Sequence, residues 1–240
     1  MFTIHPHGKN QSGFTLVELM VTLVVALVIT GAAYASYVVQ QRSFTAQDQV
    51  AEIQQNVRVG LDMMAREMRM AGFDPHLTGK YTILEEKTVG TKTYRTDAGN
   101  FIFTADLCKN GGDPASCTIG GKSTPETFLY QLYKPGYAGP NYPFALRRTP
   151  GGSAIAENIE FLEFYYTLQD GSRTLNPAPA ELNQIVTVDI TIIARADQGD
   201  HRFMSNRSFQ TPGGTVLAPA NDTYRRRMLT TTLQLRNMGL

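Results

Sequence analysis

Residues 14–42 read FTLVELMVTLVVALVITGAAYASYVVQQR, and this stretch decides what kind of chain the sequence encodes. From Leu19 to Val39 it contains 21 residues without a single charge. A helix of this length rises about 1.5 Å per residue and measures roughly 30 Å, which is the thickness of a bilayer core. The stretch therefore predicts a membrane-spanning helix near the amino terminus.

Glu18 interrupts the apolar run close to its beginning. A carboxylate inside a membrane segment costs on the order of 2.5–3.5 kcal/mol, so it indicates a function, although near the lipid headgroups it would cost little. A cation at the same depth would offset this cost. Cleavage after Gly13 would create one, because the new amino group of Phe14 would lie about one helical turn from Glu18.

Residues 1–13 contain no acid, and Lys9 adds to the positive charge of the amino terminus, which keeps such a segment in the cytoplasm. Two other interpretations of the amino terminus remain. A secretory signal peptide would be cut after Ala33-Tyr34-Ala35, and an uncut chain would keep a single-span anchor. The length of the apolar run and the presence of Glu18 speak against the signal peptide.

The junction GFTLVEL at residues 13–19 resembles the processing site of type IV prepilins and type II secretion pseudopilins. The resemblance implies that a prepilin peptidase cuts after Gly13 and that the new terminal residue, Phe14, is N-methylated. It also implies that Glu18 pairs with the terminal amine of a neighbouring subunit during assembly. Many pilins carry a proline midway along this helix, but residues 14–74 contain none, so a kink would have to use Gly31.

A helical pattern continues beyond the apolar run. Apolar residues recur at spacings of three and four, which predicts an amphipathic helix. They are Val50, Ile53, Val57, Gly60, Leu61, Met64, Met68 and Ala71. Gly72 is a plausible stop and Pro75 prevents continuation, so the sequence predicts one helix from Phe14 to about Ala71.

After Gly72 the apolar period changes to two, which is typical of strands. The predicted strands are 81–89, 100–107, 127–134, 159–167, 184–195 and 226–236. The expected fold is α+β and pilin-like, with a long amino-terminal helix whose second half packs on a carboxy-terminal antiparallel β-sheet. The expected divisions are a leader (1–13), a membrane and filament-core half-helix (14–41), an amphipathic half-helix (42–74) and a β-rich domain (75–240).

Residues 42–75, 159–166 and 224–237 resemble minor pilins of the PilW type. This resemblance implies a structural subunit of the complex that initiates a type IV pilus or forms its tip. The implied partners are other minor and major pilins, the prepilin peptidase and the inner-membrane assembly platform. The implied location is a single pass through the inner membrane with a periplasmic domain, and later the pilus. A type II secretion pseudopilin and a pilus-tip adhesin are the alternatives.

The sequence contains no pattern of an enzyme, and we expect no catalytic residue and no cofactor. Only His76 and His201 lie outside the predicted leader, and no metal-protease, serine-hydrolase or phosphate-loop motif is present. A net charge of +1 gives no reason to expect a nucleic-acid partner. Asp106, Asn110 and Asp113 could offer oxygens to Ca²⁺, but solvated loop acids are the favoured interpretation and no metal site is expected.

Cys108 and Cys117 flank a turn rich in Gly, Asp and Pro. In an oxidising compartment we expect them to form a disulfide, with free thiols as the alternative.

Arg225-Arg226-Arg227 lies at the start of a predicted strand, where alternate side chains face opposite ways, so a strand edge or a salt-bridged surface is favoured over DNA binding. The aromatic loop 133–144 is a candidate surface for partner subunits or glycans.

Overall fold

The computed structural model describes residues 13–74, 79, 81–105, 118–119, 122–123, 126–133, 144–150 and 154–238. By its internal contacts the chain divides into two units, Met1–Asp48 and Gln49–Leu240. The elements, in chain order, are α1 (Leu16–Met68), β1 (Glu86–Val89), β2 (Lys92–Arg95), β3 (Asn100–Ala105), β4 (Thr118–Ile119), β5 (Lys122–Ser123), β6 (Glu126–Tyr133), β7 (Phe144–Thr149), β8 (Ala154–Leu168), β9 (Arg173–Thr174), the 3₁₀ helix η2 (Pro179–Gln184), β10 (Ile185–Arg195), β11 (Phe209–Gln210), β12 (Val216–Leu217) and β13 (Arg226–Gln234).

The helix α1 contributes to both units, and its residues 16–48 lie in the first one. This part is rich in Leu, Val and Ala and contains no proline, so nothing in its sequence interrupts the backbone hydrogen bonds. Its large apolar side chains are exposed to the surroundings. The predicted helix is therefore present, with its first residue at Leu16 instead of Phe14.

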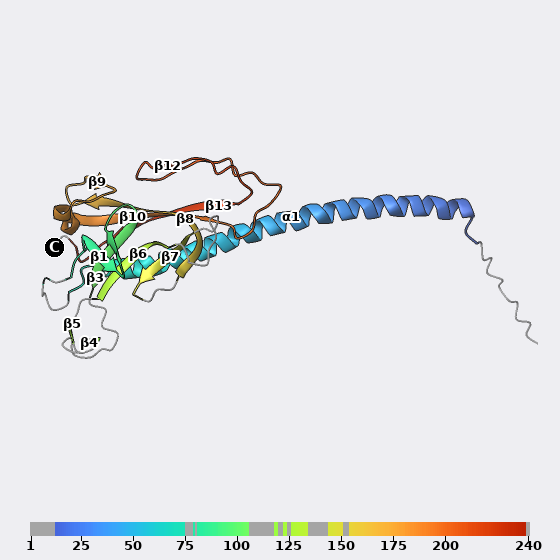
Figure 1. Ribbon diagram of the computed structural model, residues 1–240. Coiled ribbons are helices and arrows are strands. Elements are labelled where there is room, and N and C mark those ends of the chain that lie inside the picture. Colours follow the sequence, from blue (N-terminus) through green and yellow to red (C-terminus); the bar gives the residue numbers. More distant parts are fainter. Residues whose placement is uncertain are drawn as a thin grey trace, which may run out of the picture. The chain divides into compact units, whose positions relative to one another are not determined.

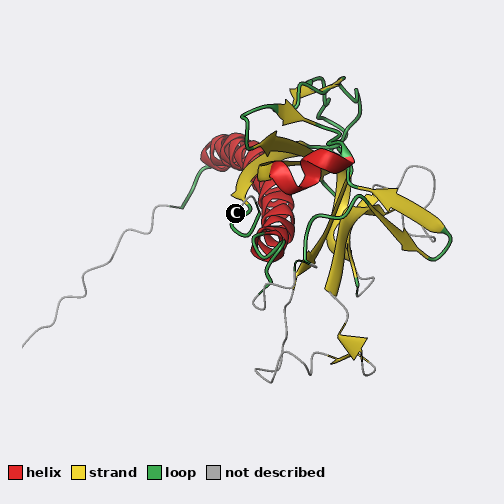
Figure 2. Ribbon diagram, turned by 90° about the vertical axis from the view of Figure 1, so that its left-hand side faces the viewer, coloured by secondary structure: helices red, strands yellow, loops and turns green. Residues whose placement is uncertain are grey.

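The second unit is built on one antiparallel sheet, whose strands are yellow in Figure 2. Its strand order is β13-β10-β8-β7-β6-β3, and β9 pairs with β8. Three small two-stranded sheets, β1-β2, β4-β5 and β11-β12, accompany it. In β10 the residues from Val186 to Ile192 alternate apolar and polar, which lets the sheet bury one face against a helix. The strand β8 departs from this alternation, since Phe161 and Leu162 are consecutive.

The core of the second unit lies between the sheet and the carboxy-terminal part of α1 (Figure 1). The buried residues of α1 are Ile53, Val57, Gly60, Leu61, Met64, Ala65 and Met68. They recur at the predicted spacing of three and four, so the amphipathic stripe is confirmed from Ile53 onward. Phe101, Phe103, Phe128, Phe164 and Tyr166 supply fully buried aromatic rings from the sheet. The α+β fold that the sequence predicts is confirmed.

Several strand boundaries differ from the prediction. Residues 81–85 form no regular strand and contribute one bridge between Ile83 and Phe103. The strand β8 begins at Ala154, five residues before the predicted start at position 159, and continues past a residue with positive φ, Asn158. The strands β2 and β7 lie outside the predicted ranges, and so do the two-residue strands β4, β5, β9, β11 and β12. In β7 the consecutive arginines Arg147 and Arg148 hide the alternation on which the prediction depends.

Candidate assembly site

The segment before α1 leaves Gly13 and Phe14 open. No atom lies within 4 Å of the position that a Cβ at Gly13 would occupy. The side chain of Phe14 is 81% exposed. Contacts within the described residues therefore give no reason for a glycine at position 13, so a requirement for it would have to come from something that binds this junction.

Thr15 and Glu18 together form the start of α1. The hydroxyl of Thr15 accepts a hydrogen bond from the backbone N–H of Glu18 at 3.3 Å, and its carbonyl accepts one from Leu19 at 3.1 Å. Thr15 is thus the N-cap, and Glu18 occupies the third helical position, as in a capping box. The pattern Thr-x-x-Glu at residues 15–18 is a local signal of this cap, although the cap is not among the features predicted above.

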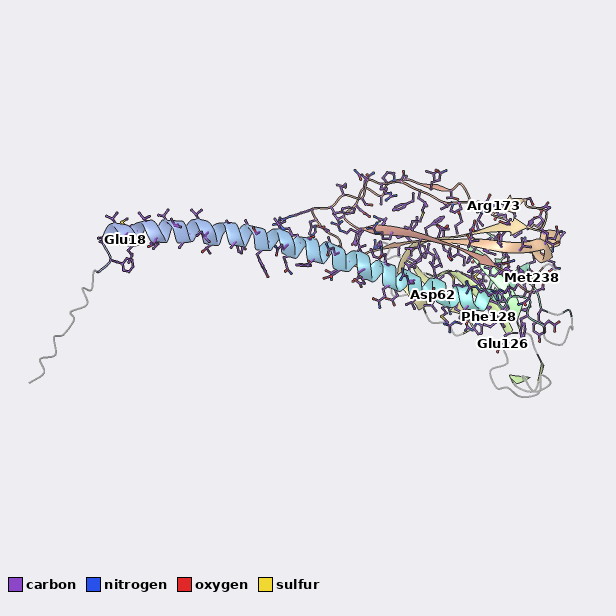
Figure 3. All side chains as sticks on the ribbon, turned by 180° about the vertical axis from the view of Figure 1, so that it is seen from behind. Glu18, Asp62, Glu126, Phe128, Arg173 and Met238 are labelled. Atoms are coloured by element: carbon purple, nitrogen blue, oxygen red, sulfur yellow. The ribbon has the colours of Figure 1, made fainter. Side chains whose placement is uncertain are left out.

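Glu18 lies in the first helical turn, where the helix dipole favours a negative charge (Figure 3). Its carboxylate makes no ion pair with any residue in the described part of the chain. The position is therefore compatible with two tasks: a local one in starting the helix, and an external one in binding a cation.

The apolar half of α1 exposes almost every large side chain, among them Leu16, Val21, Leu27 and Ile29. By length and composition this helix is suited to crossing a membrane. At Gly31 no atom lies near the position of a Cβ, so this glycine leaves an open notch on the helix surface. Exposed apolar surface of this extent needs lipid or other helices as its neighbour.

A buried polar cluster fastens the other half of α1 to the sheet. Glu67 accepts hydrogen bonds from the Tyr130 hydroxyl at 2.5 Å and from Arg148 Nε at 2.7 Å. Burial raises the pKa of Tyr130, and the hydrogen bond to Glu67 and its charge raise it further. Arg148 also lies over the ring of Phe128, 4.7 Å from its centroid. The cluster fixes the rotation and height of the helix on the sheet.

The carboxy-terminal end of α1 is closed by the last residues of the chain. The Asn237 side-chain amide donates to the carbonyls of Arg69 and Ala71 at 3.3 and 3.4 Å. Gly72 has φ +73°, and a Cβ there would lie 2.6 Å from the sulfur of Met238. The helix α1 itself ends at Met68, three residues before the predicted end at Ala71, and the chain turns through Gly72. The closing role of Asn237 is an addition that sequence spacing does not reveal.

Two of the three successive arginines form ion pairs at the start of β13. Arg225 pairs with Asp200 at 2.8 Å, and Arg226 pairs with Glu160 and Asp222 at 2.5 Å each. The hydrogen bond from Arg226 is the main cause that lowers the pKa of Asp222. The expectation of a salt-bridged surface is confirmed for Arg225 and Arg226, whereas Arg227 is exposed and forms no ion pair among the described residues.

Some predicted features lie outside the described residues. They are Cys108, Cys117, the possible Ca²⁺ ligands at 106–113 and most of the aromatic loop 133–144. The disulfide therefore stays a prediction. Among the described residues no group of three or more His, Cys, Asp or Glu side chains is arranged to hold a metal ion.

Comparisons with known proteins match both ends of the chain. Residues 8–34 match the family described as "Prokaryotic N-terminal methylation motif", and residues 145–237 match "Type IV Pilus-assembly protein W". Among solved structures, the chain is similar to a type IV-like pilin from Thermus thermophilus, with 16% identity over 78% of this chain and 98% of that chain and a TM-score of 0.46. No curated protein matches significantly.

Proposed function

We propose that this chain is a minor pilin of the complex that initiates the pilus or forms its tip, because residues 8–34 match the methylation motif and residues 145–237 match the family described as "Type IV Pilus-assembly protein W". Pilin-type proteins associate with other pilins and with assembly machinery, and their families are structural rather than enzymatic. The proposed partners are accordingly other minor and major pilins, the prepilin peptidase and the inner-membrane assembly platform.

The proposed route begins with insertion of residues 14–41 into the inner membrane, with the leader 1–13 in the cytoplasm and the domain 75–240 in the periplasm. The peptidase cuts after Gly13, and Phe14 is N-methylated. The subunit then leaves the bilayer for a bundle of helices. Glu18 offsets the charge of a neighbouring subunit's terminal amine in that bundle, where both charges would otherwise lie unpaired in a medium of low dielectric.

One observation carries the proposal: the methylation motif and the PilW region occur in one chain, together with a helix whose first half exposes apolar side chains. The apolar half supplies a surface that lipid and neighbouring helices can cover in turn. The PilW region, residues 145–237, supplies most of the sheet and favours a minor over a major subunit.

The sharpest test is Glu18→Gln, because glutamine also serves at the third position of a capping box while it lacks the charge. The helix start should survive, and cleavage after Gly13 should continue. Piliation of cells that carry only this variant should fall to the level of the deletion strain. Mass spectrometry of the mature amino terminus and electron microscopy of the pili provide the two measurements.

The matched control is Thr15→Ala, which removes the cap and leaves the carboxylate in place. If assembly depends on the charge of Glu18, Thr15→Ala should assemble much better than Glu18→Gln. Normal piliation with Glu18→Gln would refute the proposed role of this charge. A mature chain that begins at Met1 or Ser36 would refute the proposed processing.

The methylation motif does not distinguish a pilin from a type II secretion pseudopilin. The phenotype of a deletion strain distinguishes them. Loss of pili and twitching supports the proposed function, whereas loss of exoprotein secretion with intact pili supports the pseudopilin. A tip adhesin would additionally bind a surface ligand through the second unit.

A further inference from the structure

One edge of the main sheet, formed by β13, is open. Ala196 N–H donates to Arg225 C=O, and Leu235 N–H donates to Val186 C=O. With the β10–β13 register, these bonds show that the odd-numbered residues of β13 bond to β10. The N–H and C=O groups of the even-numbered residues therefore point away from the sheet. They are Arg226, Met228, Thr230, Thr232 and Gln234, and within the described chain these backbone groups have no partner.

The opposite edge, formed by β3, is closed by the chain itself. Leu84 N–H donates to Ile102 C=O at 2.9 Å, and Thr104 N–H donates to Thr82 C=O at 2.8 Å. Gly72 N–H adds a bond to Thr104 C=O at 3.0 Å. Sheets normally protect their edges in this way, because an uncovered edge is a template for another strand. The contrast makes the β13 edge a distinct feature of this fold.

A groove of about 550 Å³ runs beside the open edge, between α1 and Leu229, Thr230 and Thr231 of β13. The helix lines it with Arg58, Asp62 and Arg66 besides the apolar residues Leu61 and Ala65, and Arg69 adds to the lining directly after the helix ends. All four charged residues are exposed, and none of them forms an ion pair within the described chain. Figure 3 labels Asp62 on α1. The groove thus offers three free guanidinium groups against one carboxylate.

We propose that this groove binds an extended, acidic segment of a co-assembling subunit, which adds to β13 as a further strand. The five open N–H groups and five open C=O groups of the edge would hold the backbone of that strand. Arg58, Arg66 and Arg69 would hold its carboxylates. A second copy of this chain fits poorly, since its own groove would bring Arg58, Arg66 and Arg69 against the same three positive charges.

The dimensions of the groove specify the segment. From Arg58 to Arg69 the chain rises about 16 Å at about 1.5 Å per residue. A strand of five residues spans about 17 Å, with successive side chains on opposite faces. The segment should therefore carry two or three Asp or Glu residues at alternate positions, all facing α1. The assignment of this segment to a co-assembling subunit rests on the proposed function. Binding of a peptide to the groove can be measured without any pilus.

The test uses the detergent-solubilised full chain and a fluorescent peptide of about nine residues that alternates Glu with Val, long enough to cover the edge. Fluorescence anisotropy should show saturable binding. A twin peptide with Gln in place of Glu should bind at least about tenfold more weakly. Two further versions carry N-methyl groups either on the Glu or on the Val residues. One of them should lose binding, because only alternate N–H groups of a strand face the same edge.

Variants of the protein locate the binding. The double variant Arg58→Glu with Arg66→Glu should weaken the Glu peptide at least about tenfold. The control Lys92→Glu changes an equally exposed charge on β2 and should bind as the parent does. Thr230→Pro removes one open N–H of the edge, and Thr230→Val serves as its control. Urea unfolding checks that each variant is folded. If Thr230→Pro does not fold, the charge variants still test the proposal.

The proposal is overturned if the Glu peptide does not saturate, if the Gln peptide binds equally well, or if both N-methylated versions keep full affinity. It is also overturned if sedimentation shows that the chain pairs with itself and that Thr230→Pro abolishes this dimer. None of these outcomes depends on piliation, so they leave the Glu18→Gln experiment independent.

Discussion

Glu67 is the residue on which the docking of α1 depends most directly. Its side chain is 17% exposed and binds both Tyr130 and Arg148. Glu67→Gln removes the charge and leaves Arg148 without its ion pair in a half-buried site, so we expect a loss of about 1–3 kcal/mol in the free energy of unfolding. Urea unfolding of the detergent-solubilised chain measures this loss. Glu86→Gln, an exposed carboxylate on β1, should change the stability by less than about 0.5 kcal/mol.

Tyr130 and Tyr166 predict how stability depends on alkaline pH. Burial raises the pKa of both, with the hydrogen bond to Glu67 adding to it at Tyr130 and the charge of Asp97 at Tyr166. A tyrosine whose pKa is higher in the folded state stabilises the fold fully at pH values below its pKa in the unfolded chain, about 10. This stability is lost as the pH rises from that value through the pKa of the folded state. The free energy of unfolding should therefore fall above about pH 10.

The double variant Tyr130→Phe with Tyr166→Phe should show a flatter decline between about pH 9 and pH 11, whereas Tyr133→Phe, at a more exposed site, should not. Urea titrations at several pH values measure the slope. An unchanged slope in the double variant would show that other groups govern the alkaline transition.

These residues also mark how far the sequence alone can predict a site. Thr15 and Glu18 are three positions apart, so their capping relation can be read from local spacing. Glu67 and Arg148 are separated by 81 positions, and nothing local distinguishes Glu67 from the other carboxylates of the helix. Only the register of the helix on the sheet brings them together, and that register is a property of packing.

At the scale of elements, Gly60 sets how closely α1 approaches the sheet. A Cβ at this position would lie 3.0 Å from Cβ of Ala156 and 3.3 Å from a methyl group of Leu146. Gly60→Val should therefore force the helix off β7 and β8 and lower the free energy of unfolding by about 1–3 kcal/mol, despite the better helix propensity of valine. Thermal or urea unfolding tests this expectation.

The same substitution at Gly31 provides the matched control, because nothing lies within 4 Å of its Cβ position. Gly31→Val should leave the unfolding of the second unit unchanged. Equal losses at both positions would mean that the close approach of Gly60 to the sheet does not decide the effect, since valine has the better helix propensity at both. Gly31→Val also tests whether close helix packing at that notch matters for assembly in cells.

The elements that the sequence predicts best are those with an uninterrupted period. The stripe of α1 and the alternation of β10 lie in continuous runs, so a single face can be recognised. The strand β7 contains Arg147 and Arg148 in succession, and both are half-buried. Arg147 lies over the ring of Tyr133, and Arg148 lies over the ring of Phe128 and pairs with Glu67. Such tertiary partners override the hydrophobic pattern, which explains why this strand was missed.

For the whole molecule, the two units differ in what their surfaces require. The first unit exposes apolar side chains along its helix, and the second buries its apolar residues within its own core. The core stripe of α1 begins only at Ile53, so the second unit contains every residue of its core. Folding of the second unit should therefore be independent of the membrane, and only the first unit should need lipid, detergent or neighbouring helices.

This independence predicts that a fragment of residues 49–240 remains soluble without detergent and unfolds cooperatively. Its midpoint in urea should match that of the second unit in the full chain, apart from fraying of the shortened helix at its new start. Size-exclusion chromatography and circular dichroism measure both properties. A fragment that aggregates, or that unfolds without a cooperative transition, would mean that residues before 49 are part of the folding unit. In that case the exposed apolar helix would stabilise the sheet as well as anchor it, and substitutions along residues 16–48 would change the unfolding of the second unit.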